Sequence, residues 1–258
     1  MKCMVVIPTY NERDNIEPLV DKILGLGDHF HVTIVDDNSP DGTGEIAERL
    51  ATTTPRVQVI HRPAKQGLGT AYIAGFKHAL KNGVDYVVEM DADFSHDPDS
   101  LPGFLELMDT YDVVIGSRYV KGLAVVNWSL RRLFLSLSAN LYARWITGLP
   151  LHDCTSGFKC FKRAVLESID LDDIFANGYA FQVEMNYRAH SLGYRVGEMP
   201  IIFFDRHAGQ SKMSSKIARE AFWQILKMRV SHILRLGNFA RRTSGRASIA
   251  ARPGIESS

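Results

Sequence analysis

Two aspartates, Asp91 and Asp93, stand one residue apart directly after the apolar segment 84–90. A buried strand that ends in two carboxylates can deliver both to the edge of a parallel sheet, where open α/β sheets bind their ligands. Two hard oxygen donors suit Mg²⁺ or Mn²⁺, which take further ligands from water and substrate phosphates. The pair therefore predicts a metal–diphosphate site. Asp-rich turns after strands also cap the next helix, so the pair alone leaves both interpretations open.

The elements that would position these aspartates alternate along the first half of the chain. Short β-branched segments predict strands at 3–7, 32–36, 57–61, 86–90 and 113–116. Apolar residues at helical spacing predict helices at 12–26, 42–51, 69–81 and 99–110. This order is typical of βαβ units, and it predicts an α/β fold with a mostly parallel central sheet flanked by helices.

In the second half of the chain the predicted strands are farther apart in the sequence. We expect helices over 127–147, 180–192 and 216–236, and strands over 156–161 and 196–204. The last 22 residues, 237–258, contain four arginines and little apolar content, which predicts a disordered tail. The domain prediction is therefore a single domain over residues 1–236 followed by this tail.

Composition excludes several classes of protein. Thirty basic residues against twenty-nine acidic ones give a net charge of +1, so there is no overall charge signal for nucleic acid. Three cysteines are an odd number in a chain without a signal peptide, which favours a reduced, intracellular protein. No apolar run approaches the roughly 20 residues that a membrane span needs.

Other strand ends carry side chains that fit nucleotide chemistry. After the first predicted strand, Tyr10 can stack on a planar base, and Glu12 can accept hydrogen bonds from ring nitrogens or amines. Asp37 follows the second strand. Because the carboxyl ends of parallel strands meet at one edge of the sheet, these side chains and the aspartate pair are expected together.

Cations complete the predicted site. Arg118 follows the fifth strand, and its planar guanidinium suits phosphate. Arg206 and Lys212 stand in a later, glycine-containing loop. Metal-holding acids combined with such cations would clamp a diphosphate leaving group. The candidate catalytic residues are thus Asp91, Asp93, Arg118, Arg206 and Lys212.

Several segments together resemble a known family. They read Val-Val-Ile-Pro-Thr-Tyr-Asn-Glu at 5–12, Val-Asp-Asp-Asn-Ser-Pro-Asp-Gly-Thr at 35–43, Glu-Met-Asp-Ala-Asp-Phe-Ser-His at 89–96, Gly-Ser-Arg-Tyr at 116–119 and Asp-Arg-His-Ala-Gly-Gln-Ser-Lys-Met at 205–213. This set resembles the polyprenol (dolichol) phosphate mannosyltransferases, inverting glycosyltransferases of family 2 with the GT-A fold. The resemblance covers about residues 3–230 and includes the segment 178–184.

The resemblance implies a GT-A catalytic domain, a GDP-mannose donor, a polyprenyl phosphate acceptor and Mg²⁺ or Mn²⁺ on Asp91 and Asp93. Carried over by position, the donor contacts are Pro8, Tyr10, Glu12, Val35, Asp37, Asp91, Ala92, Asp93, Arg118, Arg206 and Lys212. Some relatives have a glutamine two residues after the second aspartate, where this chain has Ser95. A third protein ligand at that position therefore stays open.

A phosphate nucleophile needs cations rather than a general base. Its second pKa lies near ~6, so it is already largely ionised at neutral pH. The candidates for the acceptor phosphate are Arg118, Arg132 and Ser136. Arg132 and Ser136 are spaced i,i+4 on the predicted helix 127–147, opposite its leucine stripe. A solvated helix face explains these two residues equally well. Direct displacement predicts a β-linked product from an α-linked donor.

A lipid acceptor requires access to a membrane surface. The helix 127–147, with Trp128 and Trp145, is the preferred membrane-facing element, whereas the apolar stripe of the last helix is expected to pack mostly on the core. We expect a peripheral protein on the cytoplasmic face of a membrane, or one held there by a small membrane-anchoring partner.

Two other functions remain open. One is transfer of glucose from a UDP-sugar to the same lipid phosphate. The other is a non-catalytic nucleotide-sugar binding protein, which the complete set of acids and cations disfavours because binding alone does not need the whole clamp.

Overall fold

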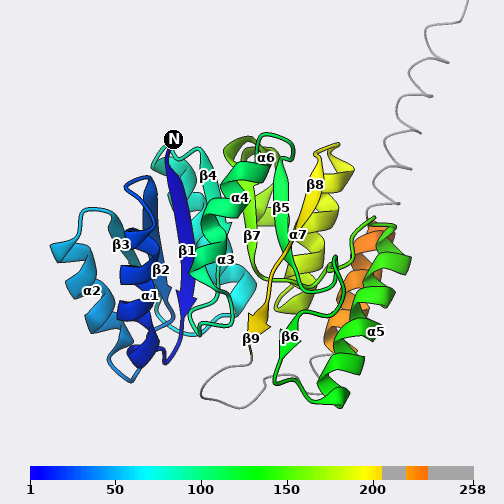
Figure 1. Ribbon diagram of the computed structural model, residues 1–258, viewed down its shortest axis with the longest axis horizontal. Coiled ribbons are helices and arrows are strands. Elements are labelled where there is room, and N and C mark those ends of the chain that lie inside the picture. The colour runs from blue at the N-terminus through cyan, green and yellow to red at the C-terminus, as the bar shows by residue number, and fades with distance from the viewer. Residues whose placement is uncertain (205–218, 232–258) are drawn as a thin grey trace, which may run out of the picture.

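A seven-stranded sheet forms the centre of the computed structural model, which describes residues 1–204 and 219–231 (Figure 1). The strand order is β3-β2-β1-β4-β7-β5-β8. The bounds are β1 Cys3–Thr9, β2 Phe30–Asp36, β3 Val57–His61, β4 Tyr86–Glu89, β5 Val113–Ser117, β7 Lys159–Lys162 and β8 Val196–Pro200. Only β7 is antiparallel to its neighbours in this sheet. The mostly parallel sheet predicted from the sequence is confirmed.

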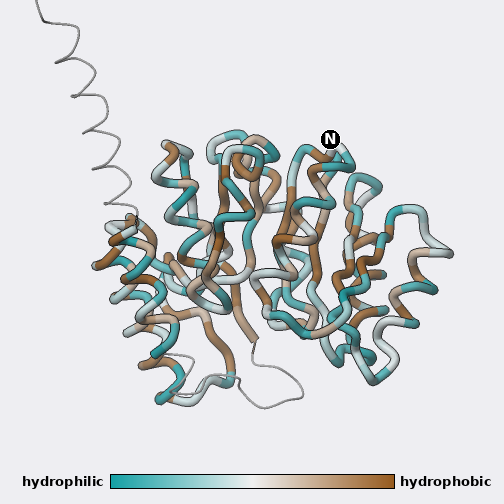
Figure 2. The backbone as a smooth tube through the Cα atoms, turned by 180° about the vertical axis from the view of Figure 1, so that it is seen from behind, coloured by the Kyte–Doolittle hydropathy of each residue, from teal (hydrophilic) through white to brown (hydrophobic). Residues whose placement is uncertain are grey.

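Helices cover both faces of the sheet. One face carries α1 (Arg13–Gly25), α2 (Thr43–Thr53) and α4 (Leu101–Leu107), and the other carries α3 (Leu68–Lys81), α6 (Arg163–Ser168) and α7 (Tyr179–Ser191). A hydrophobic core lies on each face of the sheet, and strand β1 contributes to both. Val5 and Ile7 pack on the first face, and Met4 and Val6 pack on the second. The strands are accordingly largely brown, or hydrophobic, in Figure 2.

Close packing of α3 on the sheet depends on a glycine. A Cβ atom added at Gly75 would lie 2.2 Å from Cγ1 of Val6, so a larger residue there would push the helix off β1. The position of α3 matters for the site, because its Tyr72 reaches the loop after β4.

The strand order places a ligand crevice at β1 and β4. From β1 the chain proceeds outward through β2 and β3, and it then returns to place β4 on the other side of β1. Ligands of open α/β sheets bind where the strand order reverses in this way, outside the carboxyl ends of the strands. The end of β1 and the loops after β1 and β4 carry the site residues that the sequence predicts within 8–12 and 91–93.

The second half of the chain differs from the prediction in detail. The expected strand 196–204 is divided into β8 and β9 (Phe203–Phe204), and β9 pairs with β6 (Val125–Val126), which was not predicted. Pro200 ends β8 and has no backbone donor with which to continue a ladder. Helix α6 was not predicted either, and the predicted helix 99–110 is a 3₁₀ turn (Pro98–Ser100) followed by the shorter α4.

The last predicted helix is described over 219–231. The remainder of that prediction and the predicted tail 237–258 lie outside the described residues, so the division into domain and tail stays a prediction. None of the described helices is both long enough and apolar enough to cross a membrane.

Helix α5 (Leu130–Thr147) lies at one end of the sheet, side by side with the helix 219–231 (Figure 1). The hydroxyl of Tyr142 donates to the carbonyl of Phe222 at 3.0 Å, and the two rings stack with centroids 4.3 Å apart. The buried residues of α5 are small or polar: Ser136, Asn140, Ala143 and Thr147. Its large apolar residues face outward instead: Leu130, Phe134, Leu137, Leu141 and Trp145.

Candidate active site

A cavity of about 280 Å³ opens at the carboxyl ends of β1 and β4; we call it the first cavity. The loops after β1, β2, β3 and β4 line it, together with residues that precede β7 and begin α7. It brings together seven of the residues predicted as donor contacts: Pro8, Tyr10, Glu12, Asp37, Asp91, Ala92 and Asp93. Residues that are 85 positions apart in the sequence therefore meet because parallel strands present their carboxyl ends at one edge.

Neighbouring hydroxyl groups orient the two aspartates. The hydroxyl of Tyr72 donates to Oδ1 of Asp91 at 3.0 Å. Burial raises the pKa of Tyr72, and the charge of Asp91 adds to the effect, so the phenol keeps the proton that it donates. Ser95 donates to Oδ1 of Asp93 through its backbone N–H at 3.1 Å and through its hydroxyl at 2.6 Å. Ser95 thus orients a carboxylate of the pair.

The loop that carries the aspartates has a strained backbone. Phe94 has φ of 58°, in the left-handed region that side chains other than Gly, Asn and Asp rarely adopt. Two contacts hold the loop in this form: the Ser95–Asp93 hydrogen bonds, and a bond from the backbone N–H of Asp91 to Nδ1 of His96 at 3.1 Å. Strain of this kind is concentrated at functional sites.

Charged residues form one wall of the first cavity. Nη1 of Arg62 lies 3.1 Å from Oδ1 of Asp37, and both side chains are buried. Burial raises the pKa of Asp37, while the charge of Arg62 opposes the shift. Nζ of Lys65 lies 4.0 Å from the centroid of the Tyr10 ring. A ring that attracts a cation in this way also offers a face on which a nucleotide base can stack.

A second cavity of about 380 Å³ lies next to the first. It contains Arg118, Arg132 and Ser136, the three residues predicted to position an acceptor phosphate. The two cavities have four lining residues in common: Asp91, Thr155, Gly157 and Tyr179. Asp91 therefore stands where the two cavities meet.

Arg118 is held by a buried carboxylate. Its Nε and Nη2 donate to the two oxygens of Asp153, each at 2.6 Å, and Nη2 also donates to the hydroxyl of Thr155 at 2.9 Å. Burial opposes the charged form of Arg118, but Asp153 outweighs it and raises the pKa of the guanidinium. The same pairing lowers the pKa of Asp153 although burial acts against it. Such a bidentate pair fixes the orientation of the guanidinium.

Arg132 and Ser136 do not lie on a solvated helix face, so that interpretation is wrong. Ser136 is 7% exposed, and its hydroxyl lies 2.7 Å from that of Tyr119. The guanidinium of Arg132 lies 4.1 Å from the centre of the Trp128 ring. Trp128 therefore belongs to the second cavity, whereas Trp145, also named as a membrane-facing residue, is 80% exposed.

Some predicted residues stand elsewhere. Val35 is fully buried in β2 and lines neither cavity, and Arg118 lines only the second. Arg206 and Lys212 lie outside the described residues. Sequence reasoning did not find Tyr72, His96 and Asp153. The only signal for His96 was its place in the segment 89–96, and no motif in the sequence pointed to Asp153.

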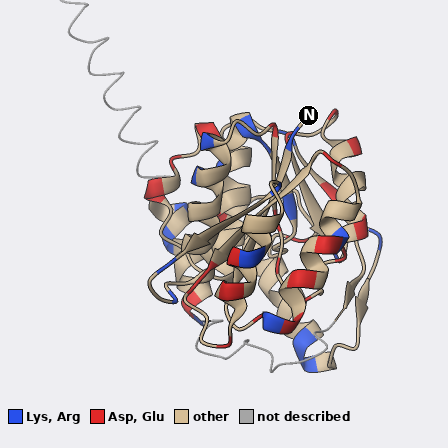
Figure 3. Cartoon of the chain, turned by 90° about the vertical axis from the view of Figure 1, so that its left-hand side faces the viewer, with Lys and Arg blue, Asp and Glu red and all other residues tan. Residues whose placement is uncertain are grey.

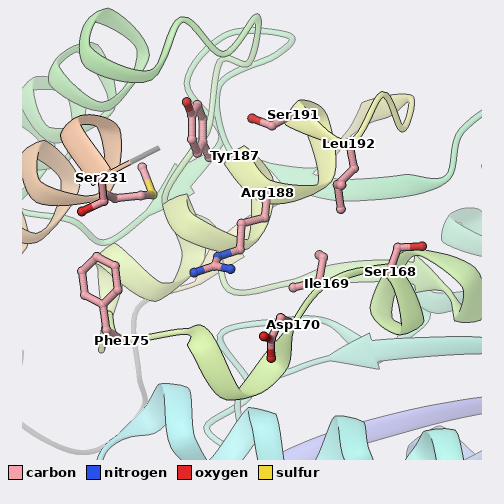
Figure 4. A pocket seen from close by; sticks show the side chains of 10 residues that line it. Ser168, Ile169, Asp170, Phe175, Tyr187, Arg188, Ser191, Leu192 and Ser231 are labelled. Atoms are coloured by element: carbon pink, nitrogen blue, oxygen red, sulfur yellow. The ribbon is translucent and has the colours of Figure 1, made fainter. Parts of the chain in front are cut away.

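A further cavity, of about 210 Å³, lies between α7, the loop after α6 and the helix 219–231 (Figure 4). It contains none of the predicted site residues. Arg188 points into its centre, but this guanidinium is bonded to Glu184 at 2.6 Å and to Asp173 at 3.1 Å. Because two carboxylates already bind this guanidinium, the cavity is a poor site for phosphate.

The donor set for a metal consists of two carboxylates. Among the residues that the structure describes, no three His, Cys, Asp or Glu side chains are grouped so that they could hold an ion. Mg²⁺ and Mn²⁺ fit a pair of carboxylates, because they are commonly bound through one or two carboxylates, with water and substrate phosphates as the other ligands. Asp91 and Asp93 fit this arrangement, and their hydroxyl partners Tyr72 and Ser95 would orient the ligand oxygens.

Two sequence relatives cover most of the chain. The polyprenol monophosphomannose synthase of Mycolicibacterium smegmatis is 46% identical over 226 residues, which are 87% of this chain and 85% of that protein. The undecaprenyl-phosphate mannosyltransferase of Micrococcus luteus is 46% identical over 221 residues, 86% of this chain and 91% of that protein.

Solved structures show the same fold. The crystal structure of glucosyl-3-phosphoglycerate synthase from Mycobacterium tuberculosis with Mn²⁺, uridine diphosphate and glucosyl-3-phosphoglycerate has a TM-score of 0.64 and 19% identity. The match covers 88% of this chain and 79% of that one. The GT-A fold predicted from the sequence is confirmed. The model of glycosyl transferase family 2 matches residues 4–170, and with the two close relatives this shows that the chain belongs to that family.

Proposed function

We propose that this protein transfers mannose from GDP-mannose to a polyprenyl phosphate, with inversion at the anomeric carbon. The observation that carries the proposal is the meeting of two cavities at Asp91, one suited to a nucleotide diphosphate and one to a phosphate on a lipid. The two relatives at 46% identity are named for mannosyl transfer to such lipids.

In the first cavity, the donor would lie across the carboxyl ends of β1, β2 and β4. Tyr10 would stack on the base, and Glu12 and Asp37 would accept hydrogen bonds from the nucleoside. A divalent ion held by Asp91 and Asp93 would supply positive charge to the departing diphosphate. Tyr72 and Ser95 keep both carboxylates oriented before the donor binds. Donor binding therefore costs less side-chain entropy at Asp91 and Asp93.

In the second cavity, the acceptor phosphate would lie between Arg118 and Arg132, with Ser136 as a further donor. The phosphate is already ionised, so these residues have to position a nucleophile rather than deprotonate it. They also offset the repulsion between two anions that must approach each other. Asp153 fixes the guanidinium of Arg118. Arg118 can therefore position the phosphate with little further loss of its own side-chain entropy.

We further propose that α5 lies against a membrane surface. Its outward apolar residues Leu130, Phe134, Leu137, Leu141 and Trp145 follow helical spacing and form a continuous stripe, which we call the α5 stripe. The exposed basic residues Arg131 and Arg144 belong to the same helix and suit anionic headgroups. Since the inner side of α5 lines the second cavity, a lipid could leave the membrane and enter that cavity directly.

The decisive experiment compares donors with a short-chain polyprenyl phosphate as acceptor. GDP-mannose should give a lipid-linked product at a rate at least tenfold above those for UDP-glucose and other nucleotide sugars. A preference for UDP-glucose would establish the glucosyltransferase alternative. Binding of a nucleotide sugar without any transfer would leave the non-catalytic alternative.

Replacement of Asp91 tests the proposed metal site. Asp91→Ala should abolish transfer at every Mg²⁺ or Mn²⁺ concentration while the circular dichroism spectrum stays that of the parent protein. Asp99→Ala is a matched control, because Asp99 follows in the same segment, is 60% exposed and pairs with Lys22. Retained transfer in Asp91→Ala would exclude Asp91 as a ligand essential to the reaction.

A further inference from the structure

His96 stands between the metal loop and the second cavity. Its Nδ1 accepts a hydrogen bond from the backbone N–H of Asp91 at 3.1 Å. A backbone N–H can only donate, so Nδ1 carries no proton in this arrangement. The imidazole is therefore neutral, with its one proton on Nε2.

The ring of His96 is fixed in place. It stacks on Phe158, with centroids 4.8 Å apart and planes 12° from parallel, and it meets Phe203 edge to face at 5.6 Å. Only 2% of the residue is exposed. A ring packed in this way, with one nitrogen bound to the backbone, presents the other nitrogen in a single direction.

The residue borders the acceptor side of the proposed site. His96 lines the second cavity and not the first. The ring of Phe203 that it contacts also meets Trp128 at 5.4 Å and lies 5.6 Å from the guanidinium carbon of Arg118. Within the described part of the chain, Nε2 has no hydrogen-bond partner, in contrast to Nδ1.

We infer that Nε2–H of His96 donates a hydrogen bond to an oxygen of the acceptor phosphate, beside Arg118 and Arg132. The inference rests on the proposed function and adds a neutral, directional donor to the two cations. A phosphate oxygen carries negative charge and accepts a stronger hydrogen bond than a lipid hydroxyl does. His96 therefore favours phosphorylated polyprenols over the corresponding alcohols, and it connects the acceptor phosphate to the backbone of Asp91.

Two isosteric substitutions separate the two nitrogens of the ring. In His96→Asn the side-chain amide occupies the place of Nδ1, so its oxygen can still accept from Asp91, but nothing replaces Nε2–H. In His96→Gln the amide reaches the place of Nε2 and the bond to Asp91 is lost. A purely structural role for His96 predicts that Asn restores function and Gln does not.

The measurement is transfer kinetics with GDP-mannose and a short-chain polyprenyl phosphate. His96→Asn should raise the KM for the acceptor by roughly 10- to 100-fold, the worth of one hydrogen bond to a charged group, with an unchanged KM for the donor. His96→Gln should keep the acceptor KM within about threefold of the parent value and lower kcat instead. An acceptor KM for His96→Asn equal to that of the parent protein would overturn the inference.

Direct binding separates this inference from the proposed function. Tryptophan fluorescence can follow titration with polyprenyl phosphate, because Trp128 lines the cavity. His96→Asn should weaken binding of the phosphate by the same factor as it raises KM, while binding of the matching polyprenol should not change. If the parent protein binds polyprenyl phosphate but transfers no mannose, the proposed function fails while this titration still decides the role of His96. If His96→Asn lost affinity for polyprenyl phosphate and for polyprenol by the same factor, that result would contradict the proposed role of His96.

Discussion

Helices α1 and α5 bury opposite kinds of residue. Helix α1 packs Ile16, Leu19, Val20 and Ile23 into the core and turns its charged residues outward. The neighbouring helix α2 likewise contains acidic and basic residues, and the side of the molecule drawn in Figure 3 shows both kinds along its helices. Helix α5, at the other end of the sheet, packs small and polar residues inward and exposes the α5 stripe. Burial of apolar residues in the core explains the pattern of α1. It does not explain why α5 exposes its large apolar residues.

Hydrogen bonds hold part of the inner side of α5. Nδ2 of Asn140 donates to the hydroxyl of Thr155 at 3.2 Å, and Oδ1 of Asn140 accepts from the backbone N–H of Thr155 at 3.2 Å. Thr155 in turn accepts a bond from Arg118. The buried polar residues of α5 thus hold residues that line the second cavity, and the outer face exposes apolar side chains.

The largest expected effect concerns the free energy of unfolding. Leu19→Ala in α1 removes a fully buried side chain and should lower that free energy by about 2–5 kcal/mol. Leu141→Ala in α5 removes a side chain that is 68% exposed and should change it by about 0.5 kcal/mol or less. Urea denaturation of both variants measures the difference. Equal losses would mean that the α5 stripe contributes to the core after all.

The buried polar side of α5 should show an intermediate effect. Asn140→Leu removes one of the two acceptors of the buried Thr155 N–H and leaves Oδ1 of Asp153 at 3.3 Å as the other, which should cost about 0.5–1.5 kcal/mol in the free energy of unfolding. It should also raise the KM for the acceptor lipid, because Thr155 helps to hold Arg118. Urea denaturation and transfer kinetics together check this prediction. A more stable variant with unchanged KM would show that the polar contacts do not serve the site.

The smallest expected effect concerns membrane affinity. Replacing Leu141 and Trp145 with serine should weaken co-sedimentation with anionic vesicles roughly tenfold, because both apolar side chains leave the interface. Leu192→Ser is the control, since Leu192 is similarly exposed but stands directly after α7 and outside the α5 stripe. Equal weakening in the control, or none in the double variant, would remove α5 as the membrane-binding helix.

The sequence predicts the parts of this molecule that follow from local pattern. Strands β1 to β5 and helices α1 to α3 lie close to their predicted positions because alternating βα segments carry strong periodicity. The shared edge of parallel strands then brings Tyr10, Asp37 and Asp91 together. Periodicity could not tell which side of α5 faces the protein, since an apolar stripe looks the same whether it meets a core or a membrane.

Contacts between distant segments were beyond prediction. Tyr72 was not predicted as a site residue, yet α3 carries its hydroxyl to Asp91. The carboxylate partner of Arg118, Asp153, is 35 residues away and reaches it because β7 runs antiparallel beside β5. Such pairs depend on the order of strands in the sheet, which no single sequence segment determines.

The anomeric configuration of the product tests the account most directly. In the proposed reaction, a lipid phosphate in the second cavity attacks the sugar in a single displacement, from the side opposite the diphosphate. Nuclear magnetic resonance of the lipid-linked mannose made from GDP-mannose should therefore show only the β anomer. An α-linked product would require either a second displacement or attack from the same side as the departing diphosphate, and it would contradict the arrangement of the two cavities proposed for the reaction.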